Sequence, residues 1–419
     1  MRRIVSILLV TATVLLAFST FAHVQPAAAR GPRQVYAYYF GWYTGDSWGD
    51  GNLADRPAAP YSSTDGGAIN RQISEAQGAG IDAFIMSWFG PKNGNLTNGV
   101  FNALLDISAS QGFHAAASVD MQEGGFNAST GEVLESLHYL IDNRVNHPAY
   151  LRYNGKPLIY FWNENRFSAA DWANMRAQVD PHHNTIWVME GTNTDLLRTF
   201  DGLYLFNIAW SGSFAGTAGG WMSKTYSAGG TFYTPTVMPG WDESRIAGRS
   251  NPTSPQSRDN NQFLINSWNG AISSGADTIL IVSWNEYLEN SYIEPSQKLG
   301  TAALDTLRPM IARWKGGSNA LAPAPAGQAS SSNPNANVSN PNNTPTALPA
   351  TGDWHGKRIT PTVDQLFVRS GPGTNYQIRD TIKRGEFYAV TDKPNDQWFQ
   401  IDYKGQKGFV YASNVTFAP

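Results

Sequence analysis

Two glutamates, Glu286 and Glu289, follow closely after the apolar run 278–282. This run is rich in β-formers and predicts a buried strand, whose end is where a barrel enzyme carries its active site. Two neighbouring carboxylates can act as acid and base on one bond, which is what cleavage of a glycosidic bond needs. If the chain turns helical here, positions three apart place their Cβ atoms ~5–6 Å from each other, which suits retention better than inversion.

The same pair also fits the first turn of a solvent-exposed helix, where the helix dipole favours glutamate. Glu294, which precedes Pro295, fits a helix start better than a third catalytic acid. Spacing alone therefore leaves the catalytic and the structural interpretation of Glu286 and Glu289 open.

Apolar runs alternate with segments of helical periodicity between Val35 and Trp314. Eight strands that alternate with helices predict an α/β fold of the (β/α)8 barrel type. A doubly wound open sheet is the competing architecture, but no G-x-G-x-x-G follows the first strand. The predicted strands are 35–40, 81–88, 114–119, 157–162, 185–190, 202–208, 232–238 and 278–282.

Composition excludes several classes of function. The net charge of −3 over 419 residues argues against a nucleic-acid partner, and the chain has no cysteine for disulfides or thiolate metal sites. No H-E-x-x-H occurs among the seven histidines. We therefore expect neither a metal nor another cofactor. The 14 Trp and 18 Tyr residues suit a neutral ligand that stacks on rings, and they equally suit a large core.

The chain is expected to have four parts. Residues 1–29 hold two arginines, an apolar run and Ala27-Ala28-Ala29, a pattern typical of a secretory signal peptide. The run is short for a membrane span, so a retained anchor is the lesser alternative, and we expect an exported protein without a membrane segment after cleavage. Residues 30–315 form the predicted barrel. Residues 316–353, rich in Pro, Ala, Ser and Asn, predict a flexible linker, and short strands in residues 354–419 predict a small all-β barrel.

The stretch that carries the two acids reads W-N-E-Y-L-E-N-S-Y-I-E-P from Trp284 onward. It resembles the motif W/F-N-E-W-H-E-G-x-x-I-E-P of glycoside hydrolase family 99, the endo-α-mannosidases. Blocks at 38–43, 80–91 and 235–246 resemble further parts of that family in the same order. The resemblance implies a (β/α)8 barrel that cleaves internal α-linkages with retention. It also implies that Glu286 deprotonates the substrate's 2-hydroxyl, which attacks C1 to give a 1,2-anhydro sugar, and that Glu289 is the acid/base.

The sequence departs from the family pattern in the sugar-binding loops. Leu288 replaces a histidine and Asn290 a glycine, while Asp120 stands where the family has a substrate-contacting glutamate. The fourth strand ends in Trp162-Asn163 in place of Tyr-Asp. The sequence of residues 290–293 is slightly more similar to the corresponding motif of the related α-glucanases of family 71. The acids are thus kept while the sugar specificity stays open between an α-mannan and an α-glucan.

Nine residues at or beyond the ends of predicted strands are candidates for contact with a glycan, although each aromatic one could equally belong to the core. They are Tyr38, Trp42, Tyr43, Trp88, Asp120, Asn163, Trp241, Trp284 and Asn285.

The C-terminal part resembles the bacterial type of Src homology 3 domain. Residues 366–376 read L-F-V-R-S-G-P-G-T-N-Y, which nearly repeats that family's motif. The resemblance implies attachment to peptidoglycan or another surface polymer; a spacer without a ligand is the alternative. We therefore expect a secreted, retaining endo-α-glycosidase held at the cell wall. The rival interpretations are a carbohydrate-binding barrel without activity and a polysaccharide-assembly relative of the same fold.

Overall fold

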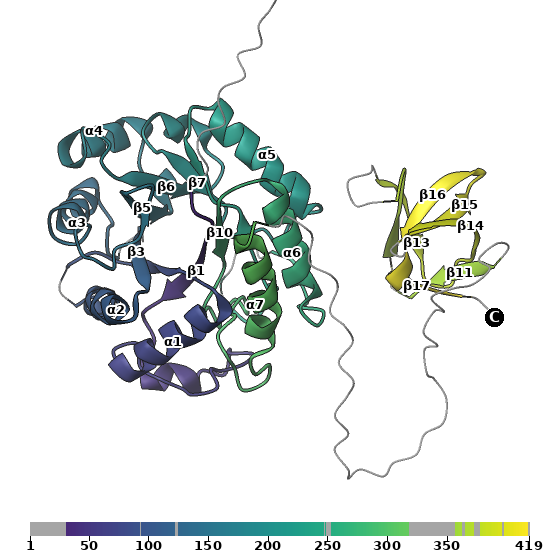
Figure 1. The fold of residues 1–419 in the computed structure, drawn as a ribbon, viewed down its shortest axis with the longest axis horizontal. Helices are drawn as coiled ribbons and strands as arrows, with labels where there is room; N and C mark the ends of the chain where they lie inside the picture. The colour runs from purple at the N-terminus through teal and green to yellow at the C-terminus, as the bar shows by residue number, and fades with distance from the viewer. Residues whose placement is uncertain are drawn as a thin grey trace, which may run out of the picture.

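The computed structural model describes residues 31–317, apart from 93, 122–124, 247 and 249–252, and residues 357–417, apart from 363–364, 373–377 and 396–397. The predicted signal peptide and nearly all of the predicted linker lie outside the described residues. The first of these parts is a ring of parallel strands surrounded by helices, and the second is an antiparallel β-sheet (Figure 1).

The strands of the first part close into a barrel. Their order is β8-β7-β6-β5-β3-β2-β1-β10-β9. Strands β8 and β9 are two halves of one strand interrupted at Thr234-Pro235; β8 pairs with β7 and β9 with β10, so the ring is complete. Proline has no N–H to donate to the ladder, which accounts for the interruption. The predicted (β/α)8 barrel is confirmed. Its strands are β1 (Gln34–Phe40), β2 (Ala83–Trp88), β3 (His114–Asp120), β5 (Lys156–Trp162), β6 (Ile186–Glu190), β7 (Gly202–Tyr204), β8 (Phe232–Tyr233), β9 (Thr236–Val237) and β10 (Thr278–Ile281), with the short β4 (Arg152–Tyr153) antiparallel to β5.

The sixth strand is shorter than predicted. Its backbone approaches that of its neighbour so closely that a Cβ at Gly202 would lie 2.0 Å from the Phe232 carbonyl oxygen. Residues 205–208 leave the sheet, and the amide of Phe206 donates to Glu190 (3.1 Å).

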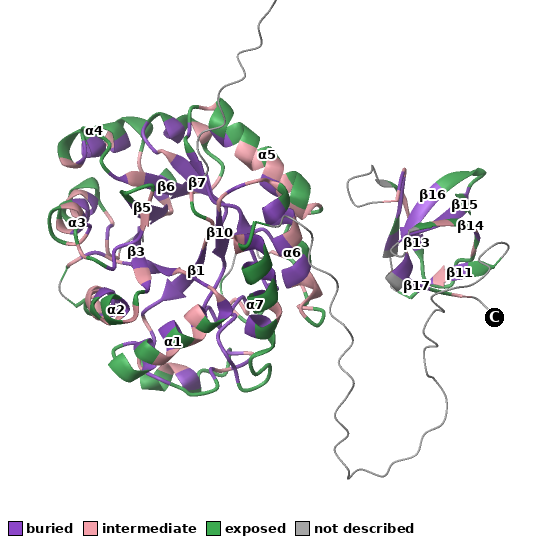
Figure 2. Ribbon diagram, viewed as in Figure 1, coloured by how far each residue is buried: buried purple, intermediate pink, exposed green. Residues whose placement is uncertain are grey.

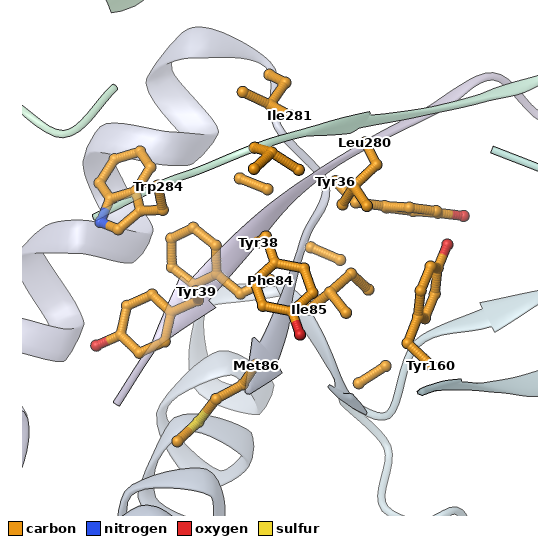
Figure 3. Packing of buried hydrophobic residues seen from close by; sticks show 14 of the residues in the cluster. Tyr36, Tyr38, Tyr39, Phe84, Ile85, Met86, Tyr160, Leu280, Ile281 and Trp284 are labelled. Carbon is orange, nitrogen blue, oxygen red and sulfur yellow. The ribbon is translucent and has the colours of Figure 1, made fainter. Parts of the chain in front are cut away.

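Both faces of the barrel strands are buried, which is why they appear in the sequence as continuous apolar runs. Tyrosines fill much of the interior and satisfy their hydroxyls there: Tyr38 donates to Ser118 (2.9 Å), and Tyr160 is bonded to Thr234 (3.2 Å). Figure 3 shows Tyr36, Tyr38 and Tyr160 in this packing.

In the described part of the chain, seven α-helices surround the strands in chain order and turn their buried faces inward (Figures 1 and 2). Several begin at a side-chain cap; for example, Asp65 accepts from Gly67 (2.8 Å) and Asn95 from Thr97 (2.8 Å). Within the described residues, no helix has the length and apolarity to cross a membrane. The helices are α1 (Gly66–Ala79), α2 (Leu96–Gln111), α3 (Thr130–Asn143), α4 (Ala169–Val179), α5 (Phe214–Ser227), α6 (Gln262–Ser273) and α7 (Ala302–Lys315), and the short 3-10 turns are η1 (Gly45–Gly49), η2 (Glu164–Arg166) and η3 (Thr194–Arg198).

The C-terminal part is an antiparallel sheet in the order β13-β12-β16-β15-β14-β11-β17. Its core contains Ile359, Val368, Ile401 and Val410. The predicted small all-β fold is confirmed. The elements are β11 (Arg358–Pro361), β12 (Gln365–Arg369), β13 (Ile378–Lys383), β14 (Tyr388–Asn395), β15 (Trp398–Tyr403), β16 (Gln406–Tyr411), η4 (Ala412–Asn414) and β17 (Val415–Phe417).

Candidate active site

Residues 283–294, here called the acid loop, leave the carboxyl end of β10 and carry both predicted catalytic acids. The loop folds back on itself, because Ser283 donates to the Ser291 carbonyl (2.8 Å) and Ile293 to the Ser283 carbonyl (3.0 Å). It contains turns and no α-helix, so the helical spacing considered for the two acids is wrong. The loop is therefore held by hydrogen bonds between its two ends instead of by helix geometry.

Asn290 explains one departure from the family motif. Its φ of 53° lies in the left-handed region, where glycine is favoured and asparagine is tolerated better than most residues. The loop can thus keep its path although the motif glycine is missing. Leu288 is half-buried and packs against the main core.

Glu286 is almost fully buried, with 4% of its surface exposed. Its amide donates to the Ser283 hydroxyl (2.8 Å), and its Oε1 accepts from the Leu288 amide (3.0 Å). Glu289 is half-buried, and its carbonyl accepts from the Asp242 amide (2.9 Å), which belongs to the loop after β9. Glu286 is thus fixed within the acid loop, and the backbone of Glu289 is fixed to the loop after β9.

Asn285, between the strand and Glu286, joins the acid loop to β1. Its side chain accepts from the amide of Phe40 (2.8 Å) and donates to the carbonyl of Phe40 (2.9 Å). The hydroxyl of Tyr43 donates to the Asn285 carbonyl (2.8 Å). The polar groups of the Asn285 and Tyr43 side chains bond the backbone, so both side chains act here on the loop.

Three of the aromatic candidates lie on different sides of the barrel sheet: one faces the interior, and two face the surrounding helices. Tyr38 lies in the barrel interior, 5.1 Å from the ring of Phe206. Trp88 stacks on Tyr139 of α3 (5.8 Å), on the helix-facing side. Trp284 packs against Phe84 (5.1 Å) on that same side, as Figure 3 shows. Trp88 and Trp284 are fully buried. They are core residues in this structure, and we withdraw them as glycan contacts.

Trp42 is half-buried and begins a row of aromatic rings across the loops that follow β1, β2 and β3. Its ring lies 5.9 Å from that of Phe89 at 16°, and Phe89 lies 6.1 Å from Phe126 at 10°. Phe89 and Phe126 were not among the sequence candidates, although Phe89 directly follows a strand. Trp241 is buried and donates its Nε1 to Glu243 (3.2 Å).

Three carboxyl groups stand at the ends of the adjacent strands β3, β5 and β6. Burial raises the pKa of Asp120 to about 7, although the Ser87 hydroxyl donates to its Oδ2 (2.7 Å). Burial, and then the charge of Glu190, raise the pKa of Glu164 to about 8. Burial also raises the pKa of Glu190. The Oδ1 of Asp120 is buried without a hydrogen-bond partner among the described residues.

Asn163 occupies the left-handed region (φ 64°) and donates to the Met121 carbonyl (2.8 Å), which ties the end of β5 to that of β3. Arg258 donates to the carbonyls of Asn290 (3.0 Å) and Tyr292 (2.7 Å) and so anchors the acid loop.

The described residues contain no group of three or more acids and histidines that could hold a metal ion.

The fold and the site define a (β/α)8 protein whose last strand opens into a loop bearing two acids. Residues 55–308 match the model of glycosyl hydrolase family 99, and residues 364–416 match that of the bacterial SH3 domain. The chain belongs to glycosyl hydrolase family 99 and carries a bacterial SH3 domain at its C-terminal end.

Relatives agree with this placement. The glycoprotein endo-alpha-1,2-mannosidase-like protein of Homo sapiens is 26% identical over 257 residues, which are 56% of this chain and 55% of that protein. The glycoprotein endo-alpha-1,2-mannosidase of Rattus norvegicus is 23% identical over 270 residues, 58% of each chain. This chain thus spans little more than half the length of these curated relatives. The solved GH99 endo-alpha-mannosidase from Bacteroides thetaiotaomicron has the same fold, with a TM-score of 0.58 at 22% identity over 67% of this chain and 98% of that one.

Proposed function

We propose that this protein hydrolyses internal α-glycosidic linkages of a mannan- or glucan-like polysaccharide with retention of configuration. The observation that carries the proposal is the placement of Glu286 and Glu289 on one loop at the carboxyl end of the barrel. That loop is fixed to β1 through Asn285 and to the loop after β9 through Glu289 itself. Membership in glycosyl hydrolase family 99 supports it.

The chemistry needs two steps at C1 of the sugar. In the first, Glu286 accepts the proton of the 2-hydroxyl, O2 attacks C1, and the bond from C1 to the leaving oxygen breaks while Glu289 protonates that oxygen. In the second, Glu289 takes a proton from water, the water oxygen attacks C1, the bond from C1 to O2 breaks, and Glu286 returns its proton to O2. Two inversions at C1 give net retention, and water is the only reactant consumed besides the glycan.

Two features of the barrel mouth suit a sugar chain. The half-buried ring of Trp42 offers a flat apolar face of the kind on which pyranose rings stack. The Oδ1 of Asp120, which has no partner among the described residues, could accept a sugar hydroxyl when the carboxyl is ionised. We propose that Trp42, Asp120 and Asn163 contact the substrate and that Tyr38, Tyr43, Trp241 and Asn285 support them from below.

Product release from α-mannan, α-1,3-glucan and cell-wall polysaccharides tests this proposal, with Glu286→Gln and Glu289→Gln beside the unaltered protein. We expect oligosaccharides from one of these polymers and loss of release in both variants. Release that is unchanged in both variants would exclude this site. Binding of a polymer without cleavage would instead support the carbohydrate-binding alternative.

We further propose that the protein is secreted and that its SH3 domain binds the cell wall. The surface of this domain offers the exposed rings of Phe367 and Phe387, with the guanidinium groups of Arg369 (5.8 Å) and Arg358 (5.2 Å) over them. Co-sedimentation of the full chain with purified wall sacculi tests this role. Phe367→Ser is expected to leave more protein in the supernatant, and equal sedimentation of both proteins would count against this surface.

A further inference from the structure

A buried carboxyl group, that of Glu294, lies at the base of the acid loop and has no role in the chemistry above. Only 3% of Glu294 is exposed. Its Oε1 accepts from Gln72 of α1 (2.7 Å), and its Oε2 accepts from the hydroxyls of Tyr287 (3.1 Å) and Tyr61 (3.2 Å). Each donor is a neutral group. This carboxyl is therefore held entirely by hydrogen bonds that converge on it from three segments of the chain.

Two of these donors connect Glu294 to the residues on either side of Glu286. Tyr287 is the residue next to Glu286, and its hydroxyl is bonded to Glu294. Tyr61 accepts from the side chain of Asn285 (2.9 Å), the residue on the other side of Glu286. The two neighbours of Glu286 are thus connected to Glu294 by one and two hydrogen bonds, respectively.

The ring of Tyr287 has little room to move. It stacks on Tyr292 (4.2 Å, 18°) and meets the edge of Trp48 (5.4 Å, 82°). Because the packed ring cannot rotate, a displacement of its hydroxyl also moves the backbone of Tyr287 and of the adjacent Glu286.

Other titratable groups face Glu294 from every side. Besides Tyr61 and Tyr287, they are Tyr39 from β1, Tyr43 from the segment after β1 and Glu75 from α1, while Arg71 packs over the ring of Tyr61 (6.0 Å). Burial, and to a lesser extent the charge of Glu75, raise the pKa of Glu294, the three hydrogen-bond donors oppose the rise, and the resulting pKa is about 8. The carboxyl therefore changes charge within the range in which an enzyme is assayed.

We propose that Glu294 is a positioning residue, which holds Tyr287 and, through Tyr61, Asn285, and so fixes the backbone on which Glu286 stands. This inference rests on the proposed function. Glu294 lies beneath the loop and does not touch the substrate. Its loss should affect turnover more than binding.

The test compares the full-length protein with Glu294→Gln and with Tyr287→Phe, which keeps the ring packing and removes one donor. We expect kcat to fall about tenfold or more in Glu294→Gln and less in Tyr287→Phe, with KM within about twofold in both. If ionisation of Glu294 alters kcat in the unaltered protein near pH 8, the variant should lose that change, since glutamine cannot ionise. Asp180→Asn is the matched control, because Asp180 is equally buried (3%) and bonds Arg176 and Thr185, away from the acid loop. It should lower stability and leave kcat and its pH profile unchanged.

Hydrogen–deuterium exchange separates this inference from the proposed function, since it needs no substrate. Amides of residues 285–291 should exchange faster in both acid-loop variants, and those of β2 should not change. Absence of turnover in the unaltered protein would count against the proposed function alone. Folded variants with unaltered kcat, pH profile and loop exchange would overturn the role of Glu294.

Discussion

The side-chain amide of Asn285 forms two hydrogen bonds with the backbone of Phe40, 2.8 Å at the amide and 2.9 Å at the carbonyl. The strand β10 has already ended at Ile281, so the side chain of Asn285 provides the hydrogen bonds that a neighbouring strand would give to Phe40. The pairing carries the order of the barrel beyond its last strand and into the acid loop. The two acids thereby gain a rigid support, as a preorganised site requires.

Replacement of Asn285 by alanine should therefore harm both stability and turnover. Two buried backbone groups of Phe40 would lose their partners, at a cost of about 1–3 kcal/mol each. We expect the free energy of unfolding to fall by that order in chemical denaturation, together with kcat. Asn143→Ala, at an exposed site on α3, should change the free energy of unfolding by less than about 0.5 kcal/mol. Equal effects of the two substitutions would contradict the role of Asn285.

Much of this architecture could be predicted from the sequence, because each barrel strand is an apolar run bounded by turn residues. Which side of a strand faces the interior could not. Both faces of the barrel strands are apolar, so alternation does not distinguish Tyr38, which points inward, from Trp88, which points to the helices. For that reason Trp88 and Trp284 were wrongly included among the glycan contacts.

The supports of the acid loop were also beyond prediction. Glu294 meets Gln72, and Asn285 meets Phe40, across separations of 222 and 245 residues. No local pattern records such contacts. A helix after β10 was considered as a condition for bringing the two acids together, but bonds from Arg258 and Asp242 to the loop carbonyls favour a compact turn instead.

The stability of the barrel should depend on pH through Asp120. Burial raises its pKa from 3.8 to about 7, so between these values the unfolded chain releases the proton while the folded chain keeps it. Stability that is present at low pH is thus lost as the pH rises towards 7. Asp120→Asn should gain stability relative to the unaltered protein over this range, by at most about 4 kcal/mol, and the gain should level off above pH 7.

Denaturation curves at a series of pH values measure this difference. Ser87→Ala provides a second check, because the Ser87 hydroxyl lowers the pKa of Asp120 and its loss should extend the effect to higher pH. A difference between Asp120→Asn and the unaltered protein that does not vary with pH would show that folding does not raise the pKa of Asp120.

The contrast between Trp42 and Trp88 gives a matched test of the glycan-binding surface. Trp42→Leu removes a half-buried ring at the barrel mouth, and we expect KM to rise about two- to tenfold, the equivalent of 0.5–1.5 kcal/mol of aromatic contact. Trp88→Leu removes a fully buried ring, so it should lower the melting temperature and leave KM unchanged. Steady-state kinetics and thermal unfolding of both variants measure these effects. A raised KM in Trp88→Leu together with an unchanged KM in Trp42→Leu would show that the substrate does not bind at Trp42.

The roles proposed for Glu286 and Glu289 can be separated by the choice of substrate. If Glu289 protonates the leaving oxygen, an aryl glycoside with a good leaving group needs that proton less, and Glu289→Gln should recover much of its lost rate on it. Glu286→Gln should not recover, because the 2-hydroxyl must still be deprotonated, and each loss on a natural linkage should reach about 10²- to 10⁴-fold. A 2-deoxy substrate should resist the unaltered protein, since it lacks the oxygen that attacks C1. Hydrolysis of that substrate at an ordinary rate would mean that a carboxylate, and not O2, is the nucleophile.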